Sequence, residues 1–135
     1  MATPEPFAYA ETLARLDAGD VADLPAELVD TPPKREALHA LLKAAEAVHR
    51  AAVSTTQVAD ALRRDQKFVR PGPPSPHLVR LRQQQAAARQ ATNQAKQAYI
   101  VAADALVRVF GLAVPARVGV EAFAQAWLRG ALGAK

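Results

Sequence analysis

Apolar residues recur at alternating steps of three and four between Pro76 and about Phe110, which predicts one long helix. At about 100° per residue the members of this series share one narrow stripe. They are six alanines and a valine: Ala88, Ala91, Ala95, Ala98, Ala102, Ala105 and Val109. Small side chains allow two helix backbones to approach closely, so we expect this stripe to be the seam of a helix–helix contact.

The other sides of this helix change in character along its length. The side that the pattern places opposite the alanines is polar and basic, with Arg82, Gln85, Arg89, Asn93 and Lys96. From Tyr99 to Phe110 apolar side chains point in every direction, with only Asp104 and Arg108 between them. A helix that is apolar all round is normally buried all round. We therefore expect other parts of the chain, or a partner, to cover this end.

A second long helix is predicted over residues 32–66. Its apolar positions repeat every 3.5 residues, which indicates pairing with another helix in a left-handed geometry. They are Leu38, Leu41, Ala45, Val48, Ala52, Thr55, Ala59 and Leu62. The proline-rich segment 67–76 breaks any helix, and its short length makes the two long helices antiparallel neighbours. Ser75 and Pro76 suit the start of the second helix of the pair.

The remaining segments are predicted to be shorter helices around this hairpin. Residues 1–30 hold two: one opened by Thr3 and Pro4 and ended by Gly19, and one with Pro25 in its first turn and Asp23 as its cap. A last helix over about 118–132 is expected to fold back over the apolar end of the hairpin. The sequence thus predicts one all-α domain over 1–135, with acidic short helices (1–30), an alanine-rich hairpin (31–110) and a C-terminal capping helix (111–135).

Composition and charge narrow the function classes. The chain has 135 residues, a net charge of +4 and no cysteine, which excludes disulfides and thiolate metal sites. No signal peptide and no membrane span are evident, so we expect a cytoplasmic or virion location; the excess of arginine over lysine is typical of a GC-rich bacterial or bacterial-virus genome. Residues 1–30 carry seven acids and one base, whereas no acid occurs between Asp65 and Asp104. These regions are expected to attract each other, or their counterparts on a neighbouring copy.

No grouping of residues predicts catalysis. Two Glu-x-x-His pairs, Glu36 with His39 and Glu46 with His49, have a spacing found in carboxylate metal proteins. They lie about 15 Å apart along one helix and off its apolar seam, so we interpret them as solvated pairs. Neither a nucleophile motif nor a phosphate-binding glycine loop is present. We expect no enzyme activity, no metal and no cofactor.

The basic stripe allows an alternative, nucleic-acid function. Arg82, Arg89 and Lys96 are spaced by seven, with Arg80 nearby, and charges in a line can bind successive phosphates. The stripe has no aromatic residue for base stacking and no recognised DNA-binding module around it. Solvation or protein docking is the competing interpretation, and the sequence favours it.

The leading hypothesis is a non-catalytic helical adaptor or assembly subunit of a larger protein complex, such as a connector or structural component of a bacterial-virus particle. Nucleic-acid binding is the alternative, and a regulatory partner of an enzyme or toxin is the third. The partners expected are other proteins or further copies of this chain, and no membrane. The expected interface consists of Ile100, Val107, Phe110, Phe123 and Trp127.

Overall fold

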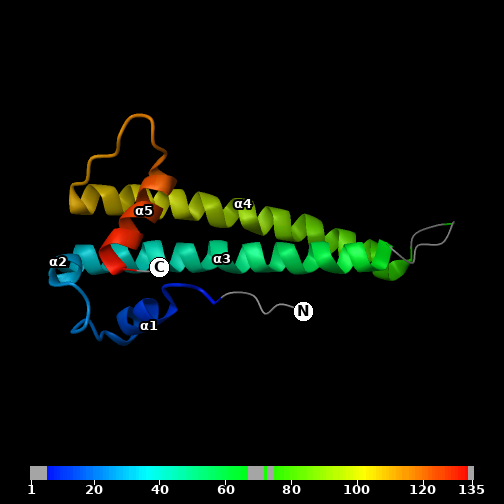
Figure 1. The fold of residues 1–135 in the computed structure, drawn as a ribbon, viewed down its shortest axis with the longest axis horizontal. Helices are drawn as coiled ribbons and strands as arrows, with labels where there is room; N and C mark the ends of the chain where they lie inside the picture. Colours follow the sequence, from blue (N-terminus) through cyan, green and yellow to red (C-terminus); the bar gives the residue numbers. More distant parts are fainter. Residues whose placement is uncertain (1–5, 67–71, 73–74, 134–135) are drawn as a thin grey trace.

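The computed structural model describes residues 6–66, 72 and 75–133 and forms five helices there, with no strand in those residues. The helices are α1 (Ala10–Ala18), α2 (Ala26–Val29), α3 (Pro32–Gln66), α4 (Pro76–Phe110) and α5 (Val120–Leu132). In Figure 1, α3 and α4 lie side by side as a long antiparallel hairpin, and α1, α2 and α5 gather where α3 begins and α4 ends. The prediction of an all-α hairpin with short N-terminal helices and a C-terminal capping helix is confirmed. Most of the proline-rich segment 67–76 lies outside the described residues.

The ends of α4 follow from local chemistry that the sequence predicted. The Ser75 hydroxyl accepts a hydrogen bond of 3.1 Å from the backbone N–H of Leu78, which caps the first turn. At the other end Gly111 has a φ of 64°, a left-handed conformation that favours glycine. This turn lets the backbone N–H of Leu112 donate to the carbonyl of Val107 at 3.0 Å.

The short helices begin later than predicted. Helix α1 begins at Ala10. Phe7 lies before it and packs on the rings of Tyr9 and His49. Thr3 and Pro4 lie outside the described residues. Pro25 is the residue before α2 and not part of its first turn. The carboxylate of Asp23 forms an ion pair with Arg15 in place of the predicted cap.

The contact between α3 and α4 uses only part of the predicted alanine stripe. Ala88 and Ala95 are buried and Ala102 is half-buried, whereas four other members of the stripe are exposed: Ala91, Ala98, Ala105 and Val109. The buried line on α4 consists of Leu78, Leu81, Ala88, Ala95, Tyr99, Ala103 and Leu106. Large side chains bury more apolar area than alanine does, so the leucines and Tyr99 set the rotation of α4.

The same correction applies to α3. Ala52 is exposed, whereas its neighbour Ala51 is buried and Ala44 takes part in the core. Midway along the hairpin the hydroxyl of Thr55 lies 3.2 Å from that of Thr92, so the two helices share a polar contact there. Toward the loop, Leu62, Leu78 and Leu81 form a small separate cluster.

The main core lies at the other end of the hairpin, where all five helices contribute. Its largest fully buried side chains are Leu38, Leu41, Leu42, Leu106 and Leu128. Helix α5 begins at Val120, two residues later than predicted, after Gly119. Within the chain the apolar end of α4 is only partly covered, since Val101 is 69% exposed. Among the described residues, no helix is long and apolar enough to cross a membrane.

Candidate interaction sites

A groove of about 670 Å³ runs between α3 and α4. Its alanines are Ala47 and Ala51 from α3 and Ala91 and Ala95 from α4. The rim is polar, with Lys43, Glu46, Arg50 and Gln94. Because alanine has no side chain beyond Cβ, a third helix could approach both backbones closely along this line.

The alanines that the α3–α4 contact leaves out extend the groove wall along α4. Ala91, Ala98, Val101, Ala105 and Val109 are all exposed; we call them the exposed strip. Their positions fall within about 80° of one another around the helix axis. The strip therefore gives α4 a second apolar side, separate from the side that packs on α3.

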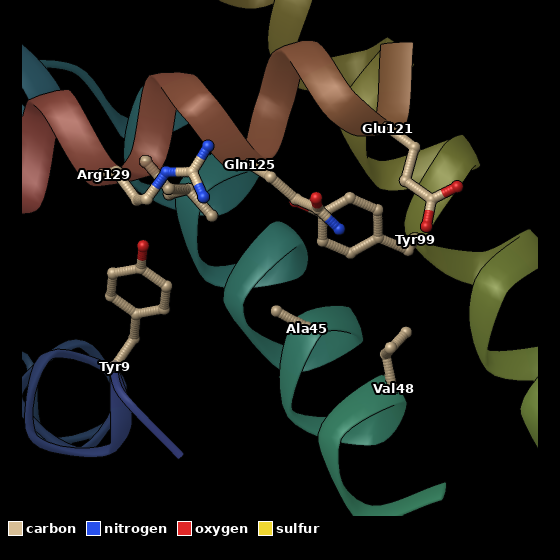
Figure 2. Close-up of a pocket in the computed structure, with 8 residues that line it drawn as sticks. Tyr9, Ala45, Val48, Tyr99, Glu121, Gln125 and Arg129 are labelled. Carbon is tan, nitrogen blue, oxygen red and sulfur yellow. The ribbon is translucent and has the colours of Figure 1, made fainter. Parts of the chain in front are cut away.

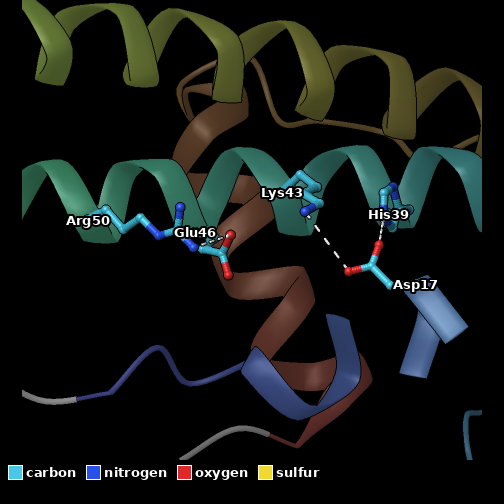
Figure 3. Close-up of polar contacts among 5 residues, drawn as sticks. All are labelled: Asp17, His39, Lys43, Glu46 and Arg50. Atoms are coloured by element: carbon cyan, nitrogen blue, oxygen red, sulfur yellow. Dashed lines mark hydrogen bonds and ion pairs between the residues drawn. The ribbon is translucent and has the colours of Figure 1, made fainter. Parts of the chain in front are cut away.

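The groove and α5 lie on different faces of the hairpin. Helix α5 passes behind α3 in the view of Figure 3, where the side chains of Lys43, Glu46 and Arg50 are drawn. On α4, Ile100 and Val107 are half-buried, whereas the exposed strip on the other flank is open. We call the side crossed by α5 the covered face and the side of the groove and exposed strip the open face.

The carboxylates near the groove are engaged by cations of the same chain (Figure 3). Arg50 Nη2 lies 3.3 Å from Glu46 Oε1. Asp17 Oδ1 accepts from His39 Nε2 at 2.5 Å, and Asp17 Oδ2 lies 4.0 Å from Lys43 Nζ. The hydrogen bond from His39, followed by the charge of Lys43, lowers the pKa of Asp17. The rim residues Lys43, Glu46 and Arg50 together carry a net charge of +1, and Asp17 lies beside Lys43.

The predicted basic stripe is exposed but lies differently from the prediction. Arg82, Arg89 and Lys96 each follow a buried residue of the α3 contact by one position, so they flank that contact. They lie opposite the exposed strip, not opposite the seam. Arg80 is two positions from Arg82, about 200° around the helix, and so does not join them. None of the four forms an ion pair with another described residue.

The five residues predicted as an interface are all half-buried within the chain: Ile100, Val107, Phe110, Phe123 and Trp127. The rings of Phe110 and Trp127 pack together with centroids 5.2 Å apart, and Lys34 Nζ lies 5.6 Å from the Phe110 centroid. The more exposed apolar residues of α4 are Val101 and Val109, which sequence reasoning assigned to other roles. The sequence gives one signal for them: Val109 belongs to the alanine stripe, and Val101 lies beside it on the helix.

Most acids of the N-terminal region that the structure describes have partners in the same chain. Arg15 pairs with Glu11 at 2.7 Å and with Asp23 at 3.6 Å. Lys34 pairs with Asp30 at 3.1 Å, and Asp17 is held by His39. The two Glu-x-x-His pairs do not converge, and the described residues contain no His/Asp/Glu cluster suited to a metal ion.

A second concavity, a pocket of about 220 Å³, lies under α5 on the covered face. Figure 2 shows Tyr9 from the turn before α1 and Tyr99 from α4 on either side of the pocket, with Gln125 and Arg129 above them. Glu121 also comes from α5 and lies at the far end, beyond Tyr99. The lining residues are Tyr9, Ala45, Val48, Tyr99, Glu121, Gln125, Leu128 and Arg129.

These features define a helical-hairpin protein with an open alanine groove on one face and a small pocket with both polar and apolar walls on the other. Comparison of the chain with family models, with curated proteins and with solved structures finds no match. The groove and the pocket are therefore the features of this protein that indicate its function.

Proposed function

We propose that this protein is a non-catalytic adaptor that joins a larger assembly by docking one helix of a partner protein into the groove between α3 and α4. The observation that carries the proposal is the exposed strip, continuous with an alanine-lined groove of about 670 Å³. An amphipathic helix that lays its apolar side into such a groove is a common mode of protein recognition. The resulting unit would be a three-helix bundle, in which the exposed strip of α4 is covered.

Charge indicates what kind of helix fits. On the rim the cations Lys43 and Arg50 outnumber the single acid Glu46, and α4 carries no acid before Asp104. A partner helix with acids beside its apolar stripe would be attracted and aligned by these cations. The partner is therefore an acidic amphipathic helix.

The same charges disfavour a second copy of this chain as the occupant. Pairing the groove sides of two copies would bring the rim cations Lys43 and Arg50 of one copy close to those of the other, whereas Arg82, Arg89 and Lys96 lie on the opposite side of α4. The acidic N-terminal region of a second copy is poorly suited to bind the groove, since its residues Glu11, Asp17, Asp23 and Asp30 already pair within their own chain. The attraction predicted between the acidic and basic regions of neighbouring copies therefore loses most of its electrostatic basis.

Binding of a designed peptide tests the proposal. The probe is a fluorescent helical peptide of about three to four turns, with Ala and Leu along one stripe and Glu elsewhere; a second peptide has Lys in place of every Glu. Fluorescence anisotropy should show saturable binding of the acidic peptide and at least about tenfold weaker binding of the basic one. Ala91→Glu, at the groove wall, should abolish binding, whereas Gln97→Glu, an exposed change of equal charge elsewhere on α4, should reduce it only slightly.

Two results would contradict this function. One is equal affinity of the acidic peptide for the wild-type protein and for Ala91→Glu. The other is sedimentation of the wild-type protein as a stable oligomer that Ala91→Glu dissociates, because the groove would then be occupied by another copy of the chain.

Nucleic-acid binding is a second candidate, and the unpaired side chains of Arg82, Arg89 and Lys96 favour it. Each is about 10 Å from the next along the helix, and all are exposed. If they contact phosphates, affinity for DNA or RNA should fall steeply with salt, and each Arg→Gln change should lower the salt slope by about one. Absence of any gel retardation at low salt would exclude this function.

A further inference from the structure

The pocket under α5 contains a buried donor that the protein itself does not use. Tyr99 is only 3% exposed, and its hydroxyl oxygen is buried without a hydrogen-bond partner among the described residues. Leaving a buried hydroxyl unpaired costs about 1–3 kcal/mol, which most proteins avoid. In Figure 2 the ring of Tyr99 extends from α4 under Gln125 toward the space between Tyr9 and Arg129.

Other donors converge on the same space. The Tyr9 hydroxyl points toward Arg129 in Figure 2, and the amide of Gln125 lies between Arg129 and the ring of Tyr99. Residues 121, 125 and 129 are spaced by four, so one side of α5 presents all three to the pocket. This end of the pocket therefore combines two hydroxyls, an amide and a guanidinium.

The protonation states keep these groups as donors. Burial, together with the nearby Tyr9 and Glu121, raises the pKa of Tyr99 to about 12. Burial also raises the pKa of Tyr9, against the opposing effect of Arg129. Both phenols therefore stay protonated near neutral pH, and each can donate to an acceptor.

The rest of the lining limits the size and shape of a ligand. Ala45, Val48 and Leu128 form an apolar part of the wall, and the carboxylate of Glu121 repels negative charge from the far end. A volume of about 220 Å³ is below the ~300–1,000 Å³ of typical drug-sized ligand sites. A nucleotide is too large and too charged for this space.

We infer that this pocket binds a small organic carboxylate, with the carboxylate held by Arg129, Tyr9 and Tyr99 and the apolar body against Val48 and Leu128. Arginine suits this role because its planar group donates two parallel hydrogen bonds to a carboxylate. The site lies on the covered face, away from the groove, so the inference does not depend on the proposed adaptor function. A bound ligand would contact α3, α4, α5 and the turn before α1 together and would stabilise the folded state by mass action.

Titration of the full-length protein with phenylacetate tests the inference, with phenylacetamide as its uncharged counterpart. Backbone amide NMR shifts of residues 121–129 should move saturably with phenylacetate, with a Kd on the order of 1 mM for a ligand this small. Phenylacetamide should bind at least about tenfold more weakly, because it lacks the charge that pairs with Arg129. The Arg129→Gln variant should lose the preference for the acid, while Arg117→Gln, a change at an exposed arginine outside the pocket, should retain it.

The Tyr99→Phe variant separates a binding role from a structural one. If the hydroxyl awaits a ligand, its removal should weaken phenylacetate binding severalfold and leave the melting temperature of the free protein unchanged or higher. A lower melting temperature of free Tyr99→Phe would mean that the hydroxyl is satisfied within the protein, and the inference would be wrong. Equal affinity for the acid and the amide, or no saturable shift with either, would also overturn it.

Discussion

The covered face and the open face of the hairpin are built from the same two helices, but among the described residues only the covered face has a third helix packed on it. On the covered face α5 crosses both long helices, and its own residues Ala124 and Leu128 are buried against the main core. On the open face the groove has walls from α3 and α4 only, and Val101 of the exposed strip remains 69% exposed. The comparison indicates that α4 has two apolar sides. The chain itself fully covers one of them and leaves the other for a partner.

Substitutions should affect the two faces very unequally, and the largest contrast concerns side-chain truncation. Leu128→Ala removes a side chain that is 1% exposed and leaves a cavity under α5, so it should cost about 2–5 kcal/mol of unfolding free energy. Val101→Ala on the open face should change the same quantity by less than about 0.5 kcal/mol. Urea unfolding followed by circular dichroism measures both. Similar losses for the two variants would remove the distinction between the faces.

A second contrast lies within the alanine stripe itself. Ala95 is 8% exposed and lies against α3, so Ala95→Leu should overpack the contact and cost about 1–3 kcal/mol. Ala91→Leu adds the same atoms to the exposed strip and should change stability by less than about 0.5 kcal/mol. Thermal unfolding of the pair measures the difference, and an equal loss in both would place Ala91 in the contact after all.

The stripe also shows how far the sequence could predict the structure. The bounds of α3 and α4, their antiparallel pairing and the cap at Ser75 follow from local patterns and were predicted. The rotation of α4 about its own axis was not predicted. The alanine stripe and the line of residues that is actually buried overlap, and both fit the same helical spacing. Only the packing of leucines and Tyr99 from separate segments selects between them.

The candidate sites were harder to predict for the same reason. The groove combines residues of α3 and α4, and the pocket combines Tyr9, from the turn before α1, with residues of α3, α4 and α5. Glu121, Gln125 and Arg129 occur at a helical spacing, but their meeting with Tyr9 and Tyr99 is a tertiary fact. The basic stripe was predicted as an exposed side of α4, since charge alone identifies it.

A smaller loss of unfolding free energy is expected for substitutions midway along the hairpin, where no other helix in the described part of the chain packs on either face. The hydroxyls of Thr55 and Thr92 lie 2.8 Å from the carbonyl of Ala51 and 2.9 Å from that of Ala88, and 3.2 Å from each other. Each hydroxyl has one proton, so when one of them donates to a backbone carbonyl the other can donate to it. Thr92→Val keeps the shape and should cost about 0.5–1.5 kcal/mol. A double-mutant cycle with Thr55→Val measures the coupling between the two helices. Strictly additive losses would show that the hydroxyls do not interact.

The smallest effect concerns pH and the attachment of α1 to α3. The hydrogen bond from His39 lowers the pKa of Asp17 in the folded state, so this contact contributes stability above the unfolded pKa of Asp and loses it as pH falls through the folded pKa. NMR titration should give Asp17 a pKa below 3.8, and His39→Gln should raise it toward that value. An unchanged Asp17 pKa in His39→Gln would show that the contact is absent in solution.

Hydrogen exchange with and without the acidic helical peptide tests the central claim, an unfilled helix site on the open face, most directly. In the free protein, amides of α4 between residues 84 and 98 should exchange faster than those near Leu106, because fewer elements cover them. The peptide should slow exchange in this segment and in residues 43–51 of α3, with little change in α5. Uniformly slow exchange along α4 in the free protein, unaltered by the peptide, would contradict the account.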